Sequence, residues 1–257
     1  MARRRRLRID RVLIALAVFI GLIGCMVFAV TSVISLFSDN DKDRNFTVMS
    51  NVSNHEDRVT VIIDPGHGGY DGGTVNGDLY EKDIVLKIAK RVKEKLLDES
   101  YINVVMTRET DIALGNNKDA DLINRAYFSS QYGAEYFVSI HVNSFEDSKV
   151  NGIEIYKKDD ESEAIAQKVM DELMALELAE NRGIFDVSGL MVLKKNIAKS
   201  ILVETGYISD SDYEYLSDDQ ELMRIADAIA KGIIKQLESD KKEWFYHFFI
   251  CFYYIFM

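Results

Sequence analysis

The apolar positions of this chain follow two patterns that alternate along most of its length. Short continuous apolar runs, typical of strands buried on both faces of a sheet, occupy residues 59–64, 103–106, 136–142, 152–156 and 201–203. Between them, apolar residues recur every three or four positions, as on one face of a helix, over residues 81–97, 119–132, 161–179 and 218–237. This alternation predicts an α/β domain with a mainly parallel twisted sheet flanked by helices. We expect the 152–156 strand at an edge of that sheet.

One long apolar run precedes this domain. Residues 12–37 contain no charged side chain, and a bilayer core requires only about 20 apolar residues, so we predict an uncleaved transmembrane helix. Six arginines before the run place the N-terminus inside the cell. The alternatives are a cleaved signal peptide, after which the domain is secreted, and a lipoprotein processed at Cys25. All three place the domain outside the cytoplasmic membrane.

Changes in composition divide the chain into four parts. Residues 1–37 form the basic N-terminus and the anchor, and residues 38–57 form a polar linker without periodicity. Residues 58–240 form the single domain described above. Residues 241–257 are rich in aromatic side chains. This tail can lie in a membrane interface or pack on the domain, and the pattern does not decide its role.

Charge and cysteine content narrow the class of protein. The net charge of the chain is −11, although residues 1–11 carry +5. The remainder is therefore strongly acidic, which excludes nucleic acid as a partner. The two cysteines, Cys25 and Cys251, lie in apolar terminal segments, so the exported domain must be stable through its core without a disulfide framework.

Two histidines stand where strands are predicted to end. His67 follows the first strand within Asp64-Pro65-Gly66-His67-Gly68-Gly69, and His141 lies at the end of the 136–142 strand. In parallel α/β sheets, ligands bind outside the carboxyl ends of the strands. The glycines beside His67 also keep side chains clear of whatever approaches it. We therefore expect the two imidazoles to converge.

Two glutamates are placed to join them. Glu81 opens the helix that follows the glycine-rich loop, where the helix dipole alone would also favour an acid. Glu204 ends the buried 201–203 strand. Two histidines, one carboxylate and a water are a recurring catalytic zinc set, and a further carboxylate can serve as the base in a hydrolysis. These residues alone do not divide the two roles between the glutamates.

The glycine-rich loop also raises the alternative of a phosphate or nucleotide site. GHGGYDGG contains no lysine of the Walker type, and three aspartates flank it or lie within it: Asp64, Asp71 and Asp78. Their charges repel phosphate, so this interpretation is disfavoured.

Four motifs in this order, DPGHGGYDGG, YEKD, SIHVN and ILVETGYIS, resemble those of the zinc-dependent N-acetylmuramoyl-L-alanine amidases of the type 3 family. The resemblance covers about residues 59–237. It implies that His67, Glu81 and His141 bind Zn²⁺ and that Glu204 is catalytic. It also implies hydrolysis of the amide that joins N-acetylmuramic acid to L-alanine in peptidoglycan.

Three arginines also match positions of that family: Arg108, Arg125 and Arg182. The resemblance implies one of two roles for them, either binding substrate carboxylates or making structural ion pairs.

The chain departs from many members of the family at two positions. Lys199 stands where a proline is common, and Phe128-Ser129 replace a frequent asparagine. Neither touches the four central residues, so activity is still expected.

A short single-domain member behind a membrane anchor resembles the spore-cortex amidases, whose cleavage lets muramic-δ-lactam form. This resemblance predicts a catalytic domain that faces the wall or the forespore intermembrane space. Two alternatives remain. One is a vegetative cell-wall amidase. The other is a peptidoglycan-binding protein with weak zinc affinity that depends on an activating protein partner.

Overall fold

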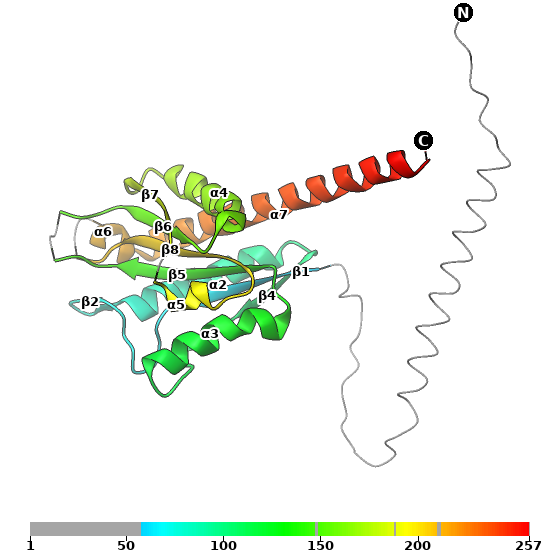
Figure 1. Ribbon diagram of the computed structural model, residues 1–257. Helices are drawn as coiled ribbons and strands as arrows, with labels where there is room; N and C mark the ends of the chain where they lie inside the picture. The colour runs from blue at the N-terminus through cyan, green and yellow to red at the C-terminus, as the bar shows by residue number, and fades with distance from the viewer. Residues whose placement is uncertain (1–57, 147–148, 188, 210–211, 257) are drawn as a thin grey trace, which may run out of the picture. The chain divides into compact units, whose positions relative to one another are not determined.

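A six-stranded sheet with strand order β4-β1-β5-β8-β6-β7 forms the centre of the computed structural model (Figure 1). The structure describes residues 58–146, 149–187, 189–209 and 212–256, with side chains up to residue 243. The strands of the sheet are β1 (Val59–Pro65), β4 (Ile102–Met106), β5 (Tyr136–Asn143), β6 (Ile153–Lys157), β7 (Asn181–Asp186) and β8 (Lys199–Tyr207). A separate hairpin consists of β2 (Val75–Asn76) and β3 (Leu79–Tyr80).

All described residues belong to one compact unit, Asn54–Met257. The anchor and the linker predicted from the sequence, residues 1–57, lie outside the described residues. Among the described helices, none has both the length and the apolar character that crossing a membrane requires.

The sheet is mainly parallel, as predicted, but it is mixed. Strands β4, β1, β5 and β8 run parallel to one another, whereas β6 is antiparallel to β8. The expectation that the 152–156 strand lies at an edge is wrong, because β6 is covered by β7. The sequence did not reveal β7, since NRGIFD contains only two consecutive apolar positions and is exposed or half-buried along its length.

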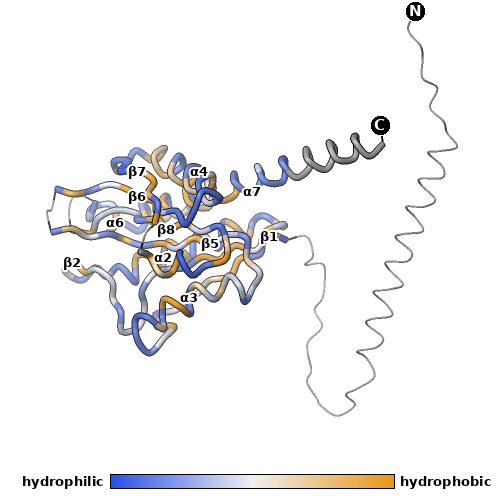
Figure 2. The backbone as a smooth tube through the Cα atoms, in the orientation of Figure 1, coloured by the Kyte–Doolittle hydropathy of each residue, from blue (hydrophilic) through white to orange (hydrophobic). Residues whose placement is uncertain are grey.

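Three helices cover one face of the sheet: α2 (Glu81–Leu97), α4 (Glu163–Met174) and α7 (Asp219–Phe256). They bury the larger hydrophobic core, which includes Val61, Val138 and Val203 of the central strands. Figure 2 shows hydrophobic and hydrophilic residues alternating along α4 and the coloured part of α7, as expected for helices with one buried face.

Two helices cover the opposite face: α3 (Lys118–Tyr132) and the short α5 (Met191–Lys194). They enclose a second core around Ile62, Phe137 and Leu202. The side chain of Asn117 caps the first turn of α3, and Gly133 ends the helix in the left-handed conformation.

Two helices differ in length from the sequence prediction. The expected 161–179 helix ends at Met174, and its first turn is a 3₁₀ helix, η1 (Asp160–Ser162). After the short α6 (Tyr213–Leu216), α7 continues past the predicted domain boundary at residue 240 to Phe256.

Side-chain alternation in the central strands brings polar groups to the carboxyl edge on the α3 side of the sheet. In β5 and β8, the buried Phe137 and Leu202 of that side are followed at even spacing by His141 and Glu204. His141 and Glu204 are register partners, and Glu204 is paired with Glu154 of β6. His141, Glu204 and Glu154 therefore form a row across three neighbouring strands.

Candidate active site

The loop after β1 holds His67 over the carboxyl edge of the sheet. His67 has a φ of +57°, in the left-handed region that few non-glycine residues adopt. Arg125 Nη2 donates to the His67 carbonyl oxygen at 2.5 Å. Gly68 and Asp71 exchange two backbone hydrogen bonds, of 2.8 and 3.2 Å. These bonds maintain a histidine conformation that would otherwise be unfavourable.

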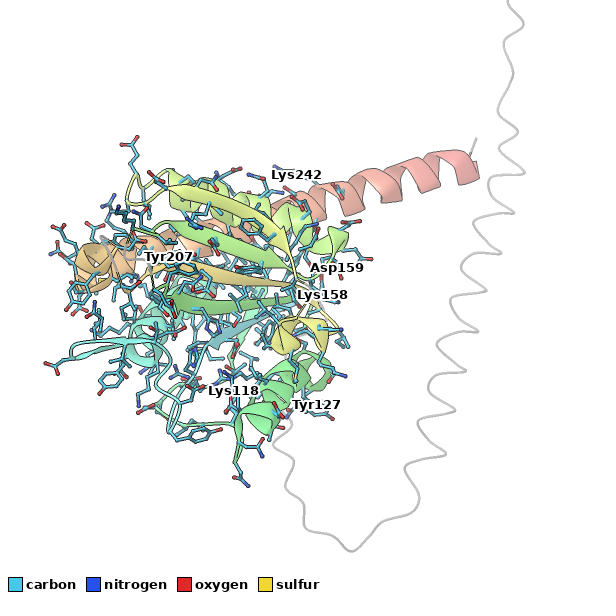
Figure 3. The ribbon with its side chains drawn as sticks, turned by 60° about the vertical axis from the view of Figure 1, so that its left-hand side comes forward. Lys118, Tyr127, Lys158, Asp159, Tyr207 and Lys242 are labelled. Carbon is cyan, nitrogen blue, oxygen red and sulfur yellow. The ribbon has the colours of Figure 1, made fainter. Side chains whose placement is uncertain are left out.

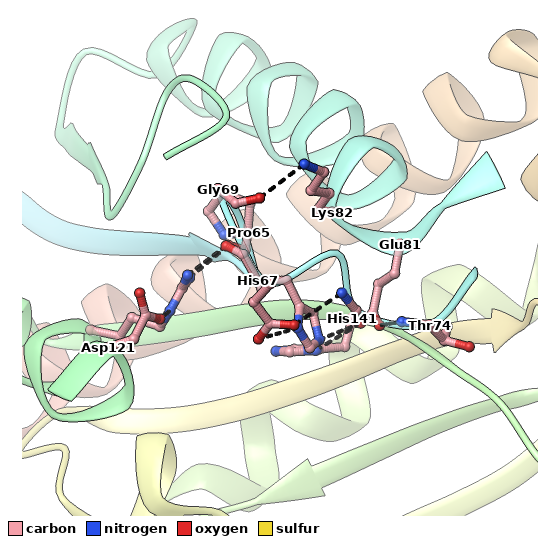
Figure 4. Close-up of polar contacts among 12 residues, drawn as sticks. Pro65, His67, Gly69, Thr74, Glu81, Lys82, Asp121 and His141 are labelled. Atoms are coloured by element: carbon pink, nitrogen blue, oxygen red, sulfur yellow. Dashed lines mark hydrogen bonds and ion pairs between the residues drawn. The ribbon is translucent and has the colours of Figure 1, made fainter. Parts of the chain in front are cut away.

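Three side chains from three segments meet at this edge (Figure 4). Glu81 Oε1 lies 3.1 Å from His67 Nε2 and 2.9 Å from His141 Nδ1. One ligand atom from each of the three residues lies within 4.8 Å of the other two. Two imidazole nitrogens and a carboxylate oxygen at this separation can hold a divalent metal ion. We refer to His67, Glu81 and His141 as the metal cluster.

Backbone donors and the two imidazoles keep the Glu81 carboxylate ionised. Its Oε1 accepts a hydrogen bond from Val142 N at 3.0 Å, and its Oε2 accepts one from Thr74 N at 2.9 Å. Burial alone would raise the pKa of Glu81, but hydrogen bonds and charge from His141 and His67 hold that pKa far below its ordinary value. The site thus presents a permanent negative charge between two histidines.

Asp71 orients His67 from the side opposite the cluster. Its Oδ2 lies 2.9 Å from His67 Nδ1, and its Oδ1 accepts a hydrogen bond from Gly73 N at 3.1 Å. Burial lowers the pKa of His67, but Glu81 and Asp71 together raise it above its ordinary value. A carboxylate behind a metal-binding imidazole fixes the ring and its tautomer. Sequence reasoning considered Asp71 only as a charge that repels phosphate, although its position four residues after His67 could have indicated this role.

Glu204 lies beside the metal cluster without being part of it. Its strand places it next to His141, and its Oε2 is buried with no hydrogen-bond partner among the described residues. Burial, reinforced by the negative charges of Glu81 and Glu154, raises the pKa of Glu204 well above its ordinary value. A buried carboxylate that is not committed to another group is suited to accept and release a proton.

Arg125 is buried beneath the loop and binds several of its groups. The residue is 2% exposed. It donates to Asp121 Oδ1 at 2.5 Å, to Asp64 Oδ1 at 2.9 Å and to the Pro65 carbonyl at 2.8 Å. Asp64 also accepts hydrogen bonds from Thr107 and Ser139. This network connects β1, α3 and the loop that carries His67.

Arg108 supports the same loop from the α2 side. It donates to the carbonyl oxygens of Pro65 at 3.0 Å, Gly66 at 2.7 Å and Lys82 at 2.8 Å. Arg108 and Arg125 are each 2% exposed, and their donors are engaged by carbonyl oxygens of the loop and, for Arg125, by Asp64 and Asp121. This geometry favours the structural one of the two roles considered for these arginines.

Arg182 lies on the edge strand β7, away from the metal cluster. Its Nε donates to Glu154, which also accepts hydrogen bonds from Tyr207 at 2.6 Å and Tyr156 at 2.9 Å. The guanidinium carbon lies 5.3 Å from the centroid of the Tyr207 ring. Arg182 therefore neutralises a buried carboxylate next to Glu204. Sequence reasoning missed Glu154, although an acid inside the apolar run IEIY is unusual.

Gly66 leaves the space that the His141 ring occupies. A Cβ added at this position would lie 2.2 Å from His141 Cε1. We expect Gly66→Ala to displace the imidazole and to weaken metal affinity by about 10- to 100-fold, as loss of a supporting contact at a metal site does. Competition with a chromophoric chelator measures this change.

Gly77→Ala is the control, because a Cβ added at Gly77 meets nothing within 4 Å, although the positive φ of Gly77, unlike the backbone of Gly66, adds strain of its own. It should leave metal affinity unchanged. Wild-type metal affinity in Gly66→Ala would contradict the steric argument.

The fold and the site together define a class of protein. An α/β domain that gathers two imidazoles and a carboxylate at the carboxyl edge of its sheet, beside a second buried carboxylate, has the arrangement of side chains that metal-dependent hydrolases use. Comparison with known proteins makes the assignment specific. The sequence profile of the family described as N-acetylmuramoyl-L-alanine amidase matches residues 61–235, and the chain belongs to this family.

Relatives of known sequence and structure agree with this assignment. The chain is 32% identical over 186 residues to the germination-specific N-acetylmuramoyl-L-alanine amidase of Bacillus subtilis (strain 168), covering 68% of this chain and 78% of that protein. The CwlD amidase from Clostridioides difficile, solved in complex with the GerS lipoprotein, gives a TM-score of 0.66 at 32% identity over 71% of this chain and 100% of that chain. The catalytic domain of CwlV from Bacillus (Paenibacillus) polymyxa var. colistinus gives a TM-score of 0.65 at 32% identity, covering 70% of this chain and 98% of that chain.

Proposed function

We propose that this amidase uses zinc to cleave the amide between N-acetylmuramic acid and L-alanine, and that it acts on the spore cortex. The observation that carries the proposal is the position of Glu204, an uncommitted buried carboxylate next to the metal cluster. Hydrolysis of an amide requires a group that removes a proton from water and returns it to the leaving nitrogen. No other described carboxylate beside the cluster lacks a hydrogen-bond or ion-pair partner.

The donor set fits zinc. Nitrogen from His67 and His141 and oxygen from Glu81 are the ligand types of catalytic zinc sites, which keep a further position open. Glycine at position 73 leaves the space that the Glu81 carboxylate occupies. A Cβ added there would lie only 2.4 Å from Glu81 Oε2. Bound zinc would supply Lewis-acid chemistry, by polarising a carbonyl oxygen and making water more acidic.

The protein groups then have separate tasks. His67, Glu81 and His141 would hold the ion, with Asp71 fixing the first imidazole. Glu204 would take a proton from the attacking water and deliver it to the nitrogen of L-alanine as the amide breaks. The raised pKa of Glu204 supports this assignment, because a carboxylate whose pKa is raised accepts a proton more readily than an ordinary one.

The three arginines would contribute indirectly. We assign Arg108 and Arg125 to the support of the loop that carries His67, and Arg182 to the neutralisation of Glu154. A direct contact between Arg182 and a substrate carboxylate remains the alternative, because its side chain is 37% exposed.

Mass spectrometry of peptidoglycan treated with the full-length protein tests the bond specificity and the metal together. We expect free peptide stems that begin with L-alanine, and glycan strands whose muramic acid has lost its peptide. Treatment with a chelator should abolish the products, and added Zn²⁺ should restore them. Products cut at any other bond would contradict the proposal, and so would full activity after complete removal of the metal.

The cortex role is supported by the similarity to the germination-specific amidase of Bacillus subtilis. Expression of this chain in a sporulating strain that lacks its own cortex amidase tests this role. Recovery of muramic-δ-lactam in the spore wall is expected, with the Glu204→Gln variant as the inactive control. If the chain instead restores only separation of growing cells, the alternative of a vegetative wall amidase is correct.

We also propose that the domain works outside the cytoplasmic membrane, held there by the segment 12–37. A protein partner that assists metal binding is the remaining alternative, supported by the relative solved with the GerS lipoprotein. Zinc affinity of the purified full chain distinguishes the cases: tight binding of the isolated protein excludes a need for such a partner.

A further inference from the structure

A cavity of about 290 Å³ opens beside the metal cluster on the α3 side of the sheet. His67 and His141 line it, together with the first turns of α3 and the segment 189–192 that leads into α5. Because the lining combines the two imidazoles with residues outside the metal cluster, the cavity can receive one of the two portions that the scissile bond joins.

The cavity contains one cation that is not engaged by the protein. Asp64 and Asp121 are both paired with the buried Arg125, and Asp71 is paired with His67. Lys118, in contrast, is exposed and has no hydrogen bond or ion pair with any described residue. It interacts only at longer range with Asp71, whose pKa it helps to lower. Figure 3 marks Lys118 at the start of α3.

The rest of the lining is apolar. It includes Leu122 of α3 together with Leu190, Met191 and Val192. An apolar surface with a single free ammonium group at its rim suits a ligand that has a small apolar portion and, further along, a negative charge.

The glycan portion and the peptide portion of the substrate differ in charge and in apolar character. The glycan portion consists of neutral N-acetylated sugars. The peptide portion begins with the methyl group of L-alanine and continues with a γ-linked D-glutamate, whose α-carboxylate is free.

We propose that this cavity binds the peptide stem, with Lys118 contacting the α-carboxylate of its second residue. Lys118 would thus determine whether the enzyme prefers stems with that carboxylate over stems in which it is amidated. The inference rests on the proposed amidase function.

Two matched muramyl tripeptides test the proposed contact of Lys118. One has D-glutamate at the second position, and the other has the α-carboxamide of the same residue. For the full chain loaded with zinc, we expect kcat/KM to be about three- to tenfold higher on the carboxylate substrate than on the carboxamide substrate. This is the range expected for one partly exposed charge pair. Lys118→Gln should remove this preference by raising KM for the carboxylate substrate alone. Lys118→Glu should reverse the preference, and it is expected to fold because an acid suits the first turn of a helix.

Lys90→Gln is the matched control, since Lys90 is an exposed lysine on α2 outside this cavity. This variant should prefer the carboxylate substrate over the carboxamide substrate as strongly as the wild type does. Equal loss of activity on both substrates in Lys118→Gln would assign a structural role to Lys118 and overturn the inference. A wild-type enzyme that cleaves both substrates equally would overturn it as well. Cleavage of neither substrate by the wild type would overturn the proposed function and this inference with it.

Discussion

Glu204→Gln is expected to lower kcat by about 10²- to 10⁴-fold, the effect of removing a general acid–base group. The amide has nearly the same shape as the carboxylate, but it cannot take a proton from water or return one to the leaving nitrogen. Because Glu204 lies outside the metal cluster, the variant should still bind metal. Steady-state kinetics on a soluble muropeptide, combined with metal analysis of the same preparation, measures both quantities.

The control separates this effect from a general loss of carboxylate charge. Glu161→Gln changes an exposed glutamate next to α4, and wild-type kinetics are expected. If Glu204→Gln binds metal normally and remains fully active, Glu204 is not the proton carrier. If it loses the metal, its role is that of a ligand.

Arg125→Met is expected to destabilise the folded protein by about 3–5 kcal/mol, which is the cost of removing one partner of a buried ion pair. The side chain is 3% exposed and pairs with Asp64 and Asp121, which would remain buried without their cation. The backbone of His67 would also lose a donor. Chemical denaturation of the full chain measures the free energy of unfolding.

The pH dependence of this variant provides a second measurement. Burial alone would raise the pKa of Asp64, but Arg125, with hydrogen bonds from Thr107 and Ser139, holds it below its ordinary value of 3.8. In the wild type, Asp64 therefore contributes stability that is present above about pH 4 and is lost as the pH falls through the lower folded pKa. Without Arg125, burial should raise the folded pKa of Asp64 instead. The stability deficit of the variant should then be largest near neutral pH and should shrink as the pH falls through that raised value.

Two substitutions serve as controls for Arg125→Met. Arg224→Met removes an arginine that is 48% exposed and pairs within α7, so little change in stability is expected. Adding Asp64→Asn to Arg125→Met should recover part of the loss, because the unpaired charge is removed. A double variant less stable than Arg125→Met would contradict the ion-pair argument.

The sequence predicted the fold and the centre of the site because both depend on local patterns. Buried parallel strands appear as continuous apolar runs, and their carboxyl ends share one edge, so convergence of His67 and His141 followed from counting positions. The structure brings these residues together with Glu81, as expected. The division of roles between Glu81 and Glu204 came only from the resemblance to the amidase family. The structure adds their positions: Glu81 lies between the two imidazoles, and register places Glu204 beside the cluster.

The remaining features depend on contacts between distant segments. Strand β7 has few buried side chains and is stabilised by pairing with β6 and by the ion pair of Arg182 with Glu154. No apolar pattern marks such a strand. The position of Glu154 depends on the reversal of β6 relative to β8, which neither segment encodes by itself.

The row formed by His141, Glu204 and Glu154 has a consequence for how this protein can change over evolution. Because successive side chains of a strand point to opposite faces, one residue inserted before Glu204 within β8 would turn its carboxylate toward the helices α2, α4 and α7. Substitutions in the strand can be absorbed by repacking, whereas a change in its length cannot. Insertions that add specificity should therefore collect in the loops beyond the strand ends, and the length of β8 should stay constant while its residues vary.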